Sequence, residues 1–524
     1  MKYTSILALA ACALAAGAAH ASGTTWLVTG PGEPATIGSQ NCTGTSCPTL
    51  RDAINSAGSG DTIAFASALD GATIRLSLAS DDVGTPSLEF GHSAFLIAGT
   101  TLTIDGGGHG ITIARDTAQP AFRLFDVAPS GSLTLIGLTL RDGAAIGGSS
   151  NGGGGALGAG GAIFNQGNLT ILACSFLDNR ALGGSGGLFG SGQGGGGGVG
   201  QDATTNDGGG PNGGAAGAPP GNGGFGGGGG ATLDTVSPGG NGGFGGGGGR
   251  GASGLGGGNG GFGGGGGGDA FLSGNGGFGG GHAGGDTDHV PTGGGGAGMG
   301  GAIFNDAGTA TIVNATFRAN SATGGNATYA GSPAAGGNGS GLGGAIFNYA
   351  GTLNLSFVTF AANATATGTG GDGGVADGGA VYSYGDKNCG AGGNTCANGT
   401  AHLVMVNSIA AQSMGAPHDV VVDVSAGGSL SSGNGNLLMA QSGFQGGFVT
   451  ADPRLGSLHT AQGAPATLPI GATSPAKDAA ANCLDAFANP VTTDARGIAR
   501  PQFGACDIGA YEYDGDYIFA NGFD

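Results

Sequence analysis

Positive charge is scarce in this sequence. The chain has 14 Lys and Arg against 33 Asp and Glu, a formal net charge of −19, and its lysines are Lys2, Lys387 and Lys477 alone. A surface this acidic repels phosphate backbones, which argues against a nucleic-acid partner. Long apolar runs are also missing beyond the N-terminus, where no segment has the roughly 18 apolar residues of a transmembrane helix. The sequence therefore predicts neither a nucleic-acid-binding protein nor a membrane-spanning one.

Proline is too rare, and glycine too irregular, for a collagen. The chain has 19 prolines and 131 glycines, and no strict Gly-x-y period runs through it. Glycine is concentrated in residues 181–299, whereas the flanking segments alternate apolar and polar residues as β-strands do. We therefore expect a folded β protein with a large glycine-rich, low-complexity insertion.

The first 21 residues have the pattern of a secretory signal peptide. Lys2 supplies the positive start, an apolar stretch runs from Ile6 to Ala19, and Ala19-His20-Ala21 is an A-x-A cleavage site. We expect cleavage after Ala21. The alternative is lipidation at Cys12, which the short apolar run before that cysteine disfavours. Both routes predict an exported protein, extracellular or on the outer cell surface.

The cysteines predict disulfides in an oxidising compartment. Short separations pair Cys42 with Cys47 and Cys389 with Cys396, and Cys483 with Cys506 would close the C-terminal region. Cys174 lies in a strand-like run, where we expect a buried thiol that packs as a small apolar side chain. Zinc is disfavoured because the cysteines form no C-x2-C pair and have no nearby His pair.

Internal repeats carry most of the structural information. Three units combine GGAIFN with a downstream FxxN, beginning at Gly160, Gly300 and Gly343, and a degenerate fourth begins at Gly378. A unit this short cannot bury a core of its own, so the units must stack. The sequence predicts an all-β protein, a single-stranded right-handed parallel β-helix, which is the solenoid architecture of pectate lyases.

Three positions of the repeat are expected to stack from coil to coil. They are an inward isoleucine (Ile163, Ile303, Ile346), an inward phenylalanine (Phe176, Phe317, Phe360) and a turn asparagine (Asn179, Asn320, Asn363). Stacked asparagines would form a ladder of side-chain amides. Ligand contact is the alternative role for these asparagines, but a residue repeated in every coil is better explained by coil geometry.

The N-terminal flank is expected to cap the stack. Thr49 is followed by an acid three residues later, and Leu50, Ala53, Ile54 and Ala57 share one face of a short helix. The expected division is a signal peptide (1–21), a cap with the first coils (22–180), the glycine-rich insertion (181–299), further coils (300–440), a C-terminal region (441–513) and a tail (514–524).

These motifs resemble those of exported bacterial proteins. GGAI followed by FxxN resembles the repeat of polymorphic outer membrane proteins, and Cys47-Pro-Thr-Leu-Arg-Asp-Ala53 resembles the CSLREA motif that begins similar β-helices. The segments 452–455, 474–476, 493–497 and 506–512 resemble the choice-of-anchor Q domain, and 518–524 resembles a short sorting tail. The resemblance implies a surface-associated β-helix. Only 43 residues follow Ala481, too few for an autotransporter barrel, so we expect another secretion route.

The insertion has its own repeat, NGGFGGGG, with phenylalanines at Phe225, Phe244, Phe262 and Phe278. One interpretation is a disordered arm, because glycine loses most conformational freedom on ordering. The other is a bundle of polyproline-II-like glycine strands pinned by the phenylalanines. An ordered bundle would present a flat, weakly charged face suited to self-association, carbohydrate or ice.

Signals for catalysis and metal binding are weak. The segment from Gly264 to Leu272 matches a calcium-binding nonapeptide, but a glycine-rich background produces that match by chance. Arginines and aspartates alternate on the early coils, where surface salt links are the commoner explanation; they are Arg115, Asp116, Arg123, Asp126, Arg141 and Asp142. We assign no catalytic, cofactor-binding or metal-ligating residue, with calcium the one cofactor that any motif suggests.

The sequence therefore predicts an exported surface β-helix with a structural, adhesive or interaction role and no covalent chemistry. Expected partners are extracellular polysaccharide or cell-surface components, with self-association through the glycine-rich segment. One alternative is a polysaccharide lyase or glycoside hydrolase, which needs paired carboxylates or calcium-binding acids on one face. The other is carbohydrate or ice binding by the glycine-rich segment.

Overall fold

The computed structural model describes residues 23–79, 91–187, 194–203, 205–269, 272–285, 292–327, 335–387 and 399–515. The predicted cleavage site after Ala21, the predicted pair Cys389 and Cys396, and the C-terminal segment 516–524 lie outside the described residues.

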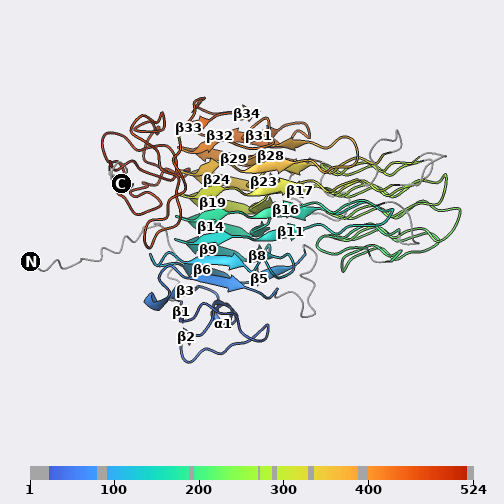
Figure 1. The fold of residues 1–524 in the computed structure, drawn as a ribbon, viewed down its shortest axis with the longest axis horizontal. Helices are drawn as coiled ribbons and strands as arrows, with labels where there is room; N and C mark the ends of the chain where they lie inside the picture. The colour runs from blue at the N-terminus through green and yellow to red at the C-terminus, as the bar shows by residue number, and fades with distance from the viewer. Residues whose placement is uncertain are drawn as a thin grey trace, which may run out of the picture.

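The described strands stack in a right-handed parallel β-helix, which confirms the predicted fold class (Figure 1). Sheet A consists, in stacking order, of β2 (Ser46–Cys47), β1 (Thr25–Val28), β3 (Asp61–Phe65), β6 (Thr101–Asp105), β9 (Ser132–Ile136), β14 (Asn168–Leu172), β19 (Thr309–Val313), β24 (Thr352–Ser356), β29 (Ala401–Val406) and β32 (Ser429–Ser432). Sheet B consists of β4 (Thr73–Leu76), β7 (Thr112–Arg115), β10 (Thr139–Arg141), β15 (Ser175–Leu177), β20 (Thr316–Arg318), β25 (Thr359–Ala361), β30 (Ile409–Ala411), β33 (Asn436–Leu438) and β35 (Phe448–Val449).

Sheet C is the third long sheet, and together sheets A, B and C form the three faces of a prism. Two short sheets, D and E, extend the central coils. Sheet C consists of β5 (Ser93–Ile97), β8 (Arg123–Val127), β13 (Ile163–Asn165), β18 (Ile303–Asp306), β23 (Ile346–Tyr349), β28 (Val381–Tyr384), β31 (Val420–Asp423) and β34 (Gln441–Ser442). Sheet D consists of β11 (Ala144–Ile146), β16 (Arg180–Leu182), β21 (Ser321–Thr323) and β26 (Ala364–Ala366). Sheet E consists of β12 (Gly158–Ala159), β17 (Gly298–Met299), β22 (Gly341–Leu342) and β27 (Ala376–Asp377).

Each central coil runs from sheet C through A, B, D and E. The chain turns at corners where a residue adopts the left-handed backbone conformation. The corner between sheets A and B has positive φ at Ala173 (50°), Asn314 (53°) and Phe357 (53°). Such angles are unfavourable for residues other than glycine, so the surrounding coils must hold them in place. The corners explain why the strands are only two to six residues long.

Apolar side chains stack inside the prism as the repeats predict. Ile163, Ile303 and Ile346 pair in register on neighbouring strands and are fully buried. The rings of Phe176 and Phe317 stack at 4.6 Å, and the ring of Phe317 stacks on Phe360 at 4.9 Å. Both predicted stacks are confirmed.

The paired glycines of GGAI have separate roles. The first glycine, at Gly160, Gly300 and Gly343, has φ of 63° to 65° and turns the chain from sheet E into sheet C. The second allows two coils to approach, because a Cβ added at Gly301 would lie 2.2 Å from the carbonyl oxygen of Gly344. The motif therefore combines a backbone angle with a close contact that only glycine tolerates.

Asparagine ladders run along two corners of the prism. In the FxxN ladder, the side chain of Asn179 donates to Asn320 and that of Asn320 donates to Asn363, both at 2.9 Å. A second ladder, which was not predicted, runs at the last residue of GGAIFN, where Asn165 donates to Asn305 at 2.6 Å and Asn305 to Asn348 at 2.8 Å. These amides are buried and bond one another, which leaves them a structural role.

The N-terminal end is closed by the predicted helix. Helix α1 (Leu50–Ser56) follows Thr49, whose hydroxyl accepts the backbone N–H of Asp52. A 3-10 turn, η1 (Ser67–Leu69), follows β3. The Cys42–Cys47 disulfide beside this helix is confirmed.

The thiol of Cys174 is buried between sheets A and B, as expected. Burial raises its pKa to about 12, so it stays protonated and unreactive at neutral pH.

The C-terminal region lies along the outer face of sheet B, on the side of the stack opposite the glycine-rich segment (Figure 1). Ser175 donates to the carbonyl of Ala466 at 2.5 Å, and Asn314 donates to the carbonyl of Thr493 at 2.8 Å. Asn407 likewise donates to the carbonyl of Asn482 at 3.0 Å. The C-terminal region therefore forms a strap, an irregular segment that hydrogen-bonds to several successive coils from outside the β-helix.

Buried residues of this region bond to one another. Arg500 and Glu512 form a fully buried ion pair at 2.8 Å, and the Arg500 guanidinium lies 4.5 Å from the Phe357 ring. The predicted Cys483–Cys506 disulfide is confirmed. The contact of Arg500 with Phe357 attaches the C-terminal region to the β-helix.

We predict that Gly301→Ala destabilises the coils by about 3 kcal/mol or more, because the new methyl group meets backbone atoms that cannot move aside. Gly32→Ala is the matched control, since no described atom lies within 4 Å of a Cβ there. Thermal unfolding followed by circular dichroism should show a midpoint lower by several degrees for Gly301→Ala alone. Equal midpoints would contradict the close-contact role.

We also predict that Asp61→Ala loosens the N-terminal cap, which the single tryptophan reports. Asp61 accepts hydrogen bonds from Trp26 Nε1 at 2.9 Å, from Gly58 N at 2.7 Å and from Thr24 N at 2.6 Å. Burial raises the pKa of Asp61, but these bonds outweigh it and lower the pKa below its ordinary value. The wild-type stabilisation is therefore present above about pH 4 and is lost as pH falls through the lowered pKa.

Tryptophan fluorescence during unfolding at pH 7 should show a loss of about 1–3 kcal/mol in Asp61→Ala, with the difference shrinking at low pH. Asp452→Ala, an exposed aspartate of the C-terminal region, is the control. A pH-independent difference would show that the carboxylate charge does not hold the cap.

Candidate interaction surface on the glycine bundle

The glycine-rich segment is an ordered bundle that projects from one side of the stack (Figure 1). Most of it comes from the connection between β16 and β17, but the corresponding connections of neighbouring coils join it. Strands from residues 147–157, 324–327, 335–340 and 367–371 hydrogen-bond to it. The bundle therefore extends beyond the predicted limits of 181–299.

Glycine strands in the bundle bond in several directions at once. The segment 194–199 exchanges backbone hydrogen bonds with Gly154, Gly209, Gly229 and Gly247, all at 2.8–2.9 Å. A strand in a sheet bonds two neighbours only. A Cβ added at Gly247 would lie 2.0 Å from the Gly154 carbonyl oxygen, so the packing requires glycine. Of the two alternatives for this segment, the described residues form the ordered one.

Phenylalanines attach the bundle to the β-helix. The rings of the NGGF repeats stack at 4.8 Å (Phe225 and Phe244), 5.1 Å (Phe244 and Phe262) and 5.4 Å (Phe262 and Phe278). The ring centroid of Phe262 lies 4.3 Å from that of Tyr349, and that of Phe278 lies 3.9 Å from that of Tyr384. Aromatic contact thus fixes the bundle on the outer face of sheet C.

A further aromatic stack, which was not predicted, lies beneath these rings. Phe164, Phe304, Phe347 and Tyr382 stack at 5.2, 5.3 and 5.4 Å on the outer face of sheet C. The sequence did contain a signal for this stack. Successive side chains of a strand point to opposite faces, so the phenylalanine of GGAIFN must point outward when the isoleucine before it points inward. An apolar residue on an outer face requires a cover, and the bundle supplies it.

The NGGF arms form the outer layer of the bundle. Each arm bonds the next through its backbone, as in Gly223 N to Asn241 O, Gly242 N to Asn259 O and Gly260 N to Asn275 O, all 2.8 Å. The returning glycine strands behind them are buried, whereas the four arm asparagines (Asn222, Asn241, Asn259, Asn275) are exposed. The arms therefore present one regular face to solvent.

The distal loops between arms expose apolar side chains. Leu233, Val236 and Leu272 are 62%, 74% and 59% exposed. The loop 251–257 lies between the two loops that carry them, since Ala252 N bonds Ser237 O and Gly257 N bonds Leu272 O, and its Leu255 is 39% exposed. The tip of the bundle thus exposes apolar side chains on three successive loops.

Aspartates hold these loops in shape. The buried carboxylate of Asp269 accepts the backbone N–H groups of Gly254, Gly256 and Leu272 at 3.0–3.2 Å. Asp234 accepts the Ser237 hydroxyl at 2.8 Å and the Val236 N–H at 3.0 Å. The aspartate of the calcium-like segment from Gly264 to Leu272 therefore serves as a loop anchor.

The arginines of the early coils bond mainly to backbone carbonyls. Arg115 donates to the carbonyls of Asp142 at 2.8 Å and Gln119 at 3.0 Å, and burial lowers the pKa of its guanidinium. Arg141 forms surface ion pairs with Asp142 at 3.0 Å and with Asp178 at 3.1 Å. Asp116 caps a turn by accepting the N–H of Ala118. These groups are used to hold the coils.

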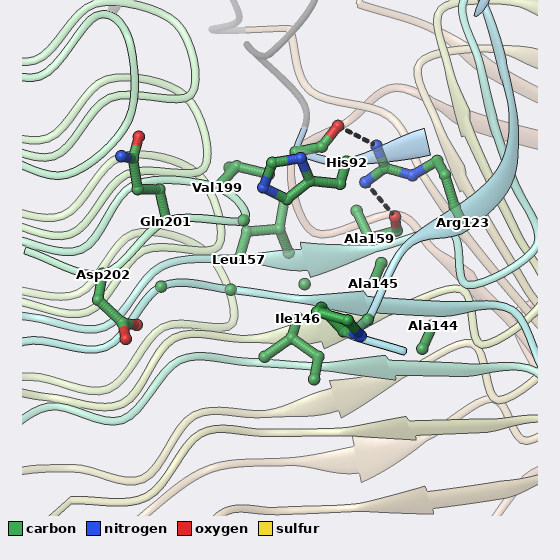
Figure 2. Close-up of a pocket in the computed structure, with 17 residues that line it drawn as sticks. His92, Arg123, Ala144, Ala145, Ile146, Leu157, Ala159, Val199, Gln201 and Asp202 are labelled. Carbon is green, nitrogen blue, oxygen red and sulfur yellow. Dashed lines mark hydrogen bonds between the residues drawn. The ribbon is translucent and has the colours of Figure 1, made fainter. Parts of the chain in front are cut away.

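A pocket of about 430 Å³ lies where sheet C meets the bundle (Figure 2). Arg123 turns its guanidinium toward backbone carbonyls, donating to Gly91 and Ala159 at 3.1 Å each, while Asp202 lies across the pocket. Asp202 accepts the Ser149 N–H at 2.6 Å, and Asp126 is buried on the strand of Arg123. Most of the lining is glycine, alanine and aliphatic side chains. The pocket brings together no opposed pair of carboxylates from the described residues.

Among the described residues, no group of three or more His, Cys, Asp or Glu side chains gathers in a way that could hold a metal ion. In the same residues, no helix combines the length and apolarity needed to cross a bilayer.

We predict that Phe244→Ala loosens the bundle and spares the β-helix. The substitution removes the centre of the ring stack and its contact with Tyr349, whose ring centroid lies 5.5 Å away. Buried Phe→Ala changes cost about 3–5 kcal/mol. Hydrogen exchange should accelerate at least tenfold in bundle glycines and stay unchanged in the strands of sheet A. Phe487→Ala, an exposed phenylalanine, is the control. Uniform acceleration in both parts would show that they unfold as one.

Comparison with known proteins adds little to this picture. No family model and no curated protein matches the chain. Among solved structures, the chain is similar to one titled "Crystal structure of pectate lyase Pel9A", at 13% sequence identity and a TM-score of 0.26, covering 94% of this chain and 97% of that chain. A likeness this weak carries no argument about activity, and the parallel β-helix stands on the strand pairing itself.

Proposed function

We propose that the protein is an exported, surface-associated β-helix that adheres to cell-surface components through the tip of its glycine bundle. The observation that carries this proposal is the apolar surface of Leu233, Val236 and Leu272 on loops whose backbone is held by aspartates. Exposed apolar groups on a preorganised loop favour binding, because little conformational freedom is lost when a partner covers them.

Other features support the same proposal. The two disulfides among the described residues fit an oxidising compartment, and the signal-like N-terminus supports export. The motif resemblance to polymorphic outer membrane proteins and choice-of-anchor Q domains is consistent with attachment at a surface. A lyase or hydrolase role has less support, since the arginines considered for it hold backbone carbonyls or surface aspartates.

The test is retention of the purified mature chain on bacterial cells, compared with Leu233→Ser/Val236→Ser/Leu272→Ser. We expect retention to weaken at least tenfold, because burying one such side chain contributes about 1.5–3 kcal/mol. The matched control is Val424→Ser/Leu430→Ser/Phe503→Ser, three exposed apolar residues outside the bundle. Equal retention of the two variants would contradict the proposal. If the tip instead mediates self-association, sedimentation will show wild-type oligomers that the tip variant lacks, without retention on cells.

A further inference from the structure

A row of asparagine amides runs across the outer layer of the bundle, in the arms that adjoin the distal loops. Asn241 N donates to the Oδ1 of Asn222 and Asn259 N to the Oδ1 of Asn241, both at 2.8 Å, and Asn275 N to the Oδ1 of Asn259 at 2.9 Å. Each bond fixes one side chain by its oxygen. The nitrogen of each amide is left with two N–H donors that no described acceptor of the protein engages. This asparagine row, Asn222, Asn241, Asn259 and Asn275, is exposed throughout.

The row has a regular period. The phenylalanines three residues along from each asparagine stack at 4.8, 5.1 and 5.4 Å, which gives the spacing from arm to arm. Donors at this repeat suit a ligand that offers acceptors at a similar repeat along an extended chain. The oxygens of successive units in a linear polysaccharide meet that requirement.

The surroundings of the row restrict the charge of the ligand. The arms 221–225, 240–244, 258–262 and 274–278 contain only Gly, Asn and Phe, so the face offers no cation to an anionic sugar. The net charge of −19 adds a general repulsion of polyanions. Glycines beside each asparagine let a chain lie close to the backbone. A neutral polysaccharide fits best.

We propose that the asparagine row is a binding site for a neutral linear polysaccharide, with the amide nitrogens donating to successive sugar units along the bundle. The site differs from the apolar tip in residues and in chemistry, so it stands independently of the adhesive function proposed above.

The experiment measures retention of the mature chain on gels containing cellulose, mannan or a β-1,3-glucan, with polygalacturonate as the anionic comparison. Asn241→Asp/Asn259→Asp keeps the oxygen that accepts the backbone N–H and removes the amide donors. We expect the wild type to be retained on at least one neutral polysaccharide, and this variant to bind it at least tenfold more weakly. The tip variant Leu233→Ser/Val236→Ser/Leu272→Ser should bind it like the wild type.

The charge-matched control is Asn168→Asp/Asn482→Asp. Both asparagines are exposed outside the bundle, and Asn482 Oδ1 also accepts a backbone N–H, from Leu484 at 2.9 Å. This control should bind like the wild type. Should the middle pair disturb the bundle, Asn275→Ala is the second variant, because that side chain ends the row and orients no further rung. We expect it to weaken binding several-fold with an unchanged melting temperature.

Several results would overturn the proposal. They are full retention of Asn241→Asp/Asn259→Asp, an equal loss in the charge-matched control, or retention of the wild type on polygalacturonate alone. Loss confined to the tip variant would move the polysaccharide to the distal loops and leave the adhesive function standing. Inhibition of ice growth without retention on any polysaccharide would assign the row to ice.

Discussion

The absence of a Cβ at specific positions is the constraint on which the whole molecule depends. In the coils, the second glycine of GGAI brings one corner against the carbonyl of the next, and in the bundle the same contact occurs on every side of a strand. Backbone groups there bond other backbone groups without side chains between them. Such ordering costs glycine more conformational entropy than it costs any other residue. The bundle therefore depends on cooperative bonding and on its aromatic attachment.

That attachment explains how two unlike bodies form one protein. Sheet C carries isoleucines on its inner face and aromatic rings on its outer face, so one strand such as β13 serves two cores. The C-terminal strap covers sheet B on the other side through Arg500, Glu512 and its disulfide. The β-helix is thus held from both flanks, which leaves the outer layer and tip of the bundle as its projecting surfaces.

The parts that sequence reasoning reached are those in which side chains repeat. Ile163, Phe176 and Asn179 recur at nearly constant intervals, and their stacking follows from the period alone. Phe164 repeats as regularly, but its role depends on a cover that lies elsewhere in the chain. Glycine has no side chain whose polarity would distinguish a buried from an exposed position. The sequence therefore could not decide whether the bundle is ordered, and it could not show that residues 147–157 join the bundle. The asparagine row could not be predicted either, because it depends on the register between neighbouring arms, and the backbone hydrogen bonds set that register.

Repetition in the bundle also bears on how such a protein changes over generations. Each NGGF arm with its returning strand is a closed unit that bonds the next unit in the same way, and its two ends lie at the distal loops. Duplication or loss of one unit in the gene would widen or narrow the bundle by one arm and one asparagine, and would add or remove one ring of the stack that contacts sheet C. The length of the exposed face is therefore set by a copy number, within the limit of the aromatic surface that sheet C offers to the phenylalanine rings.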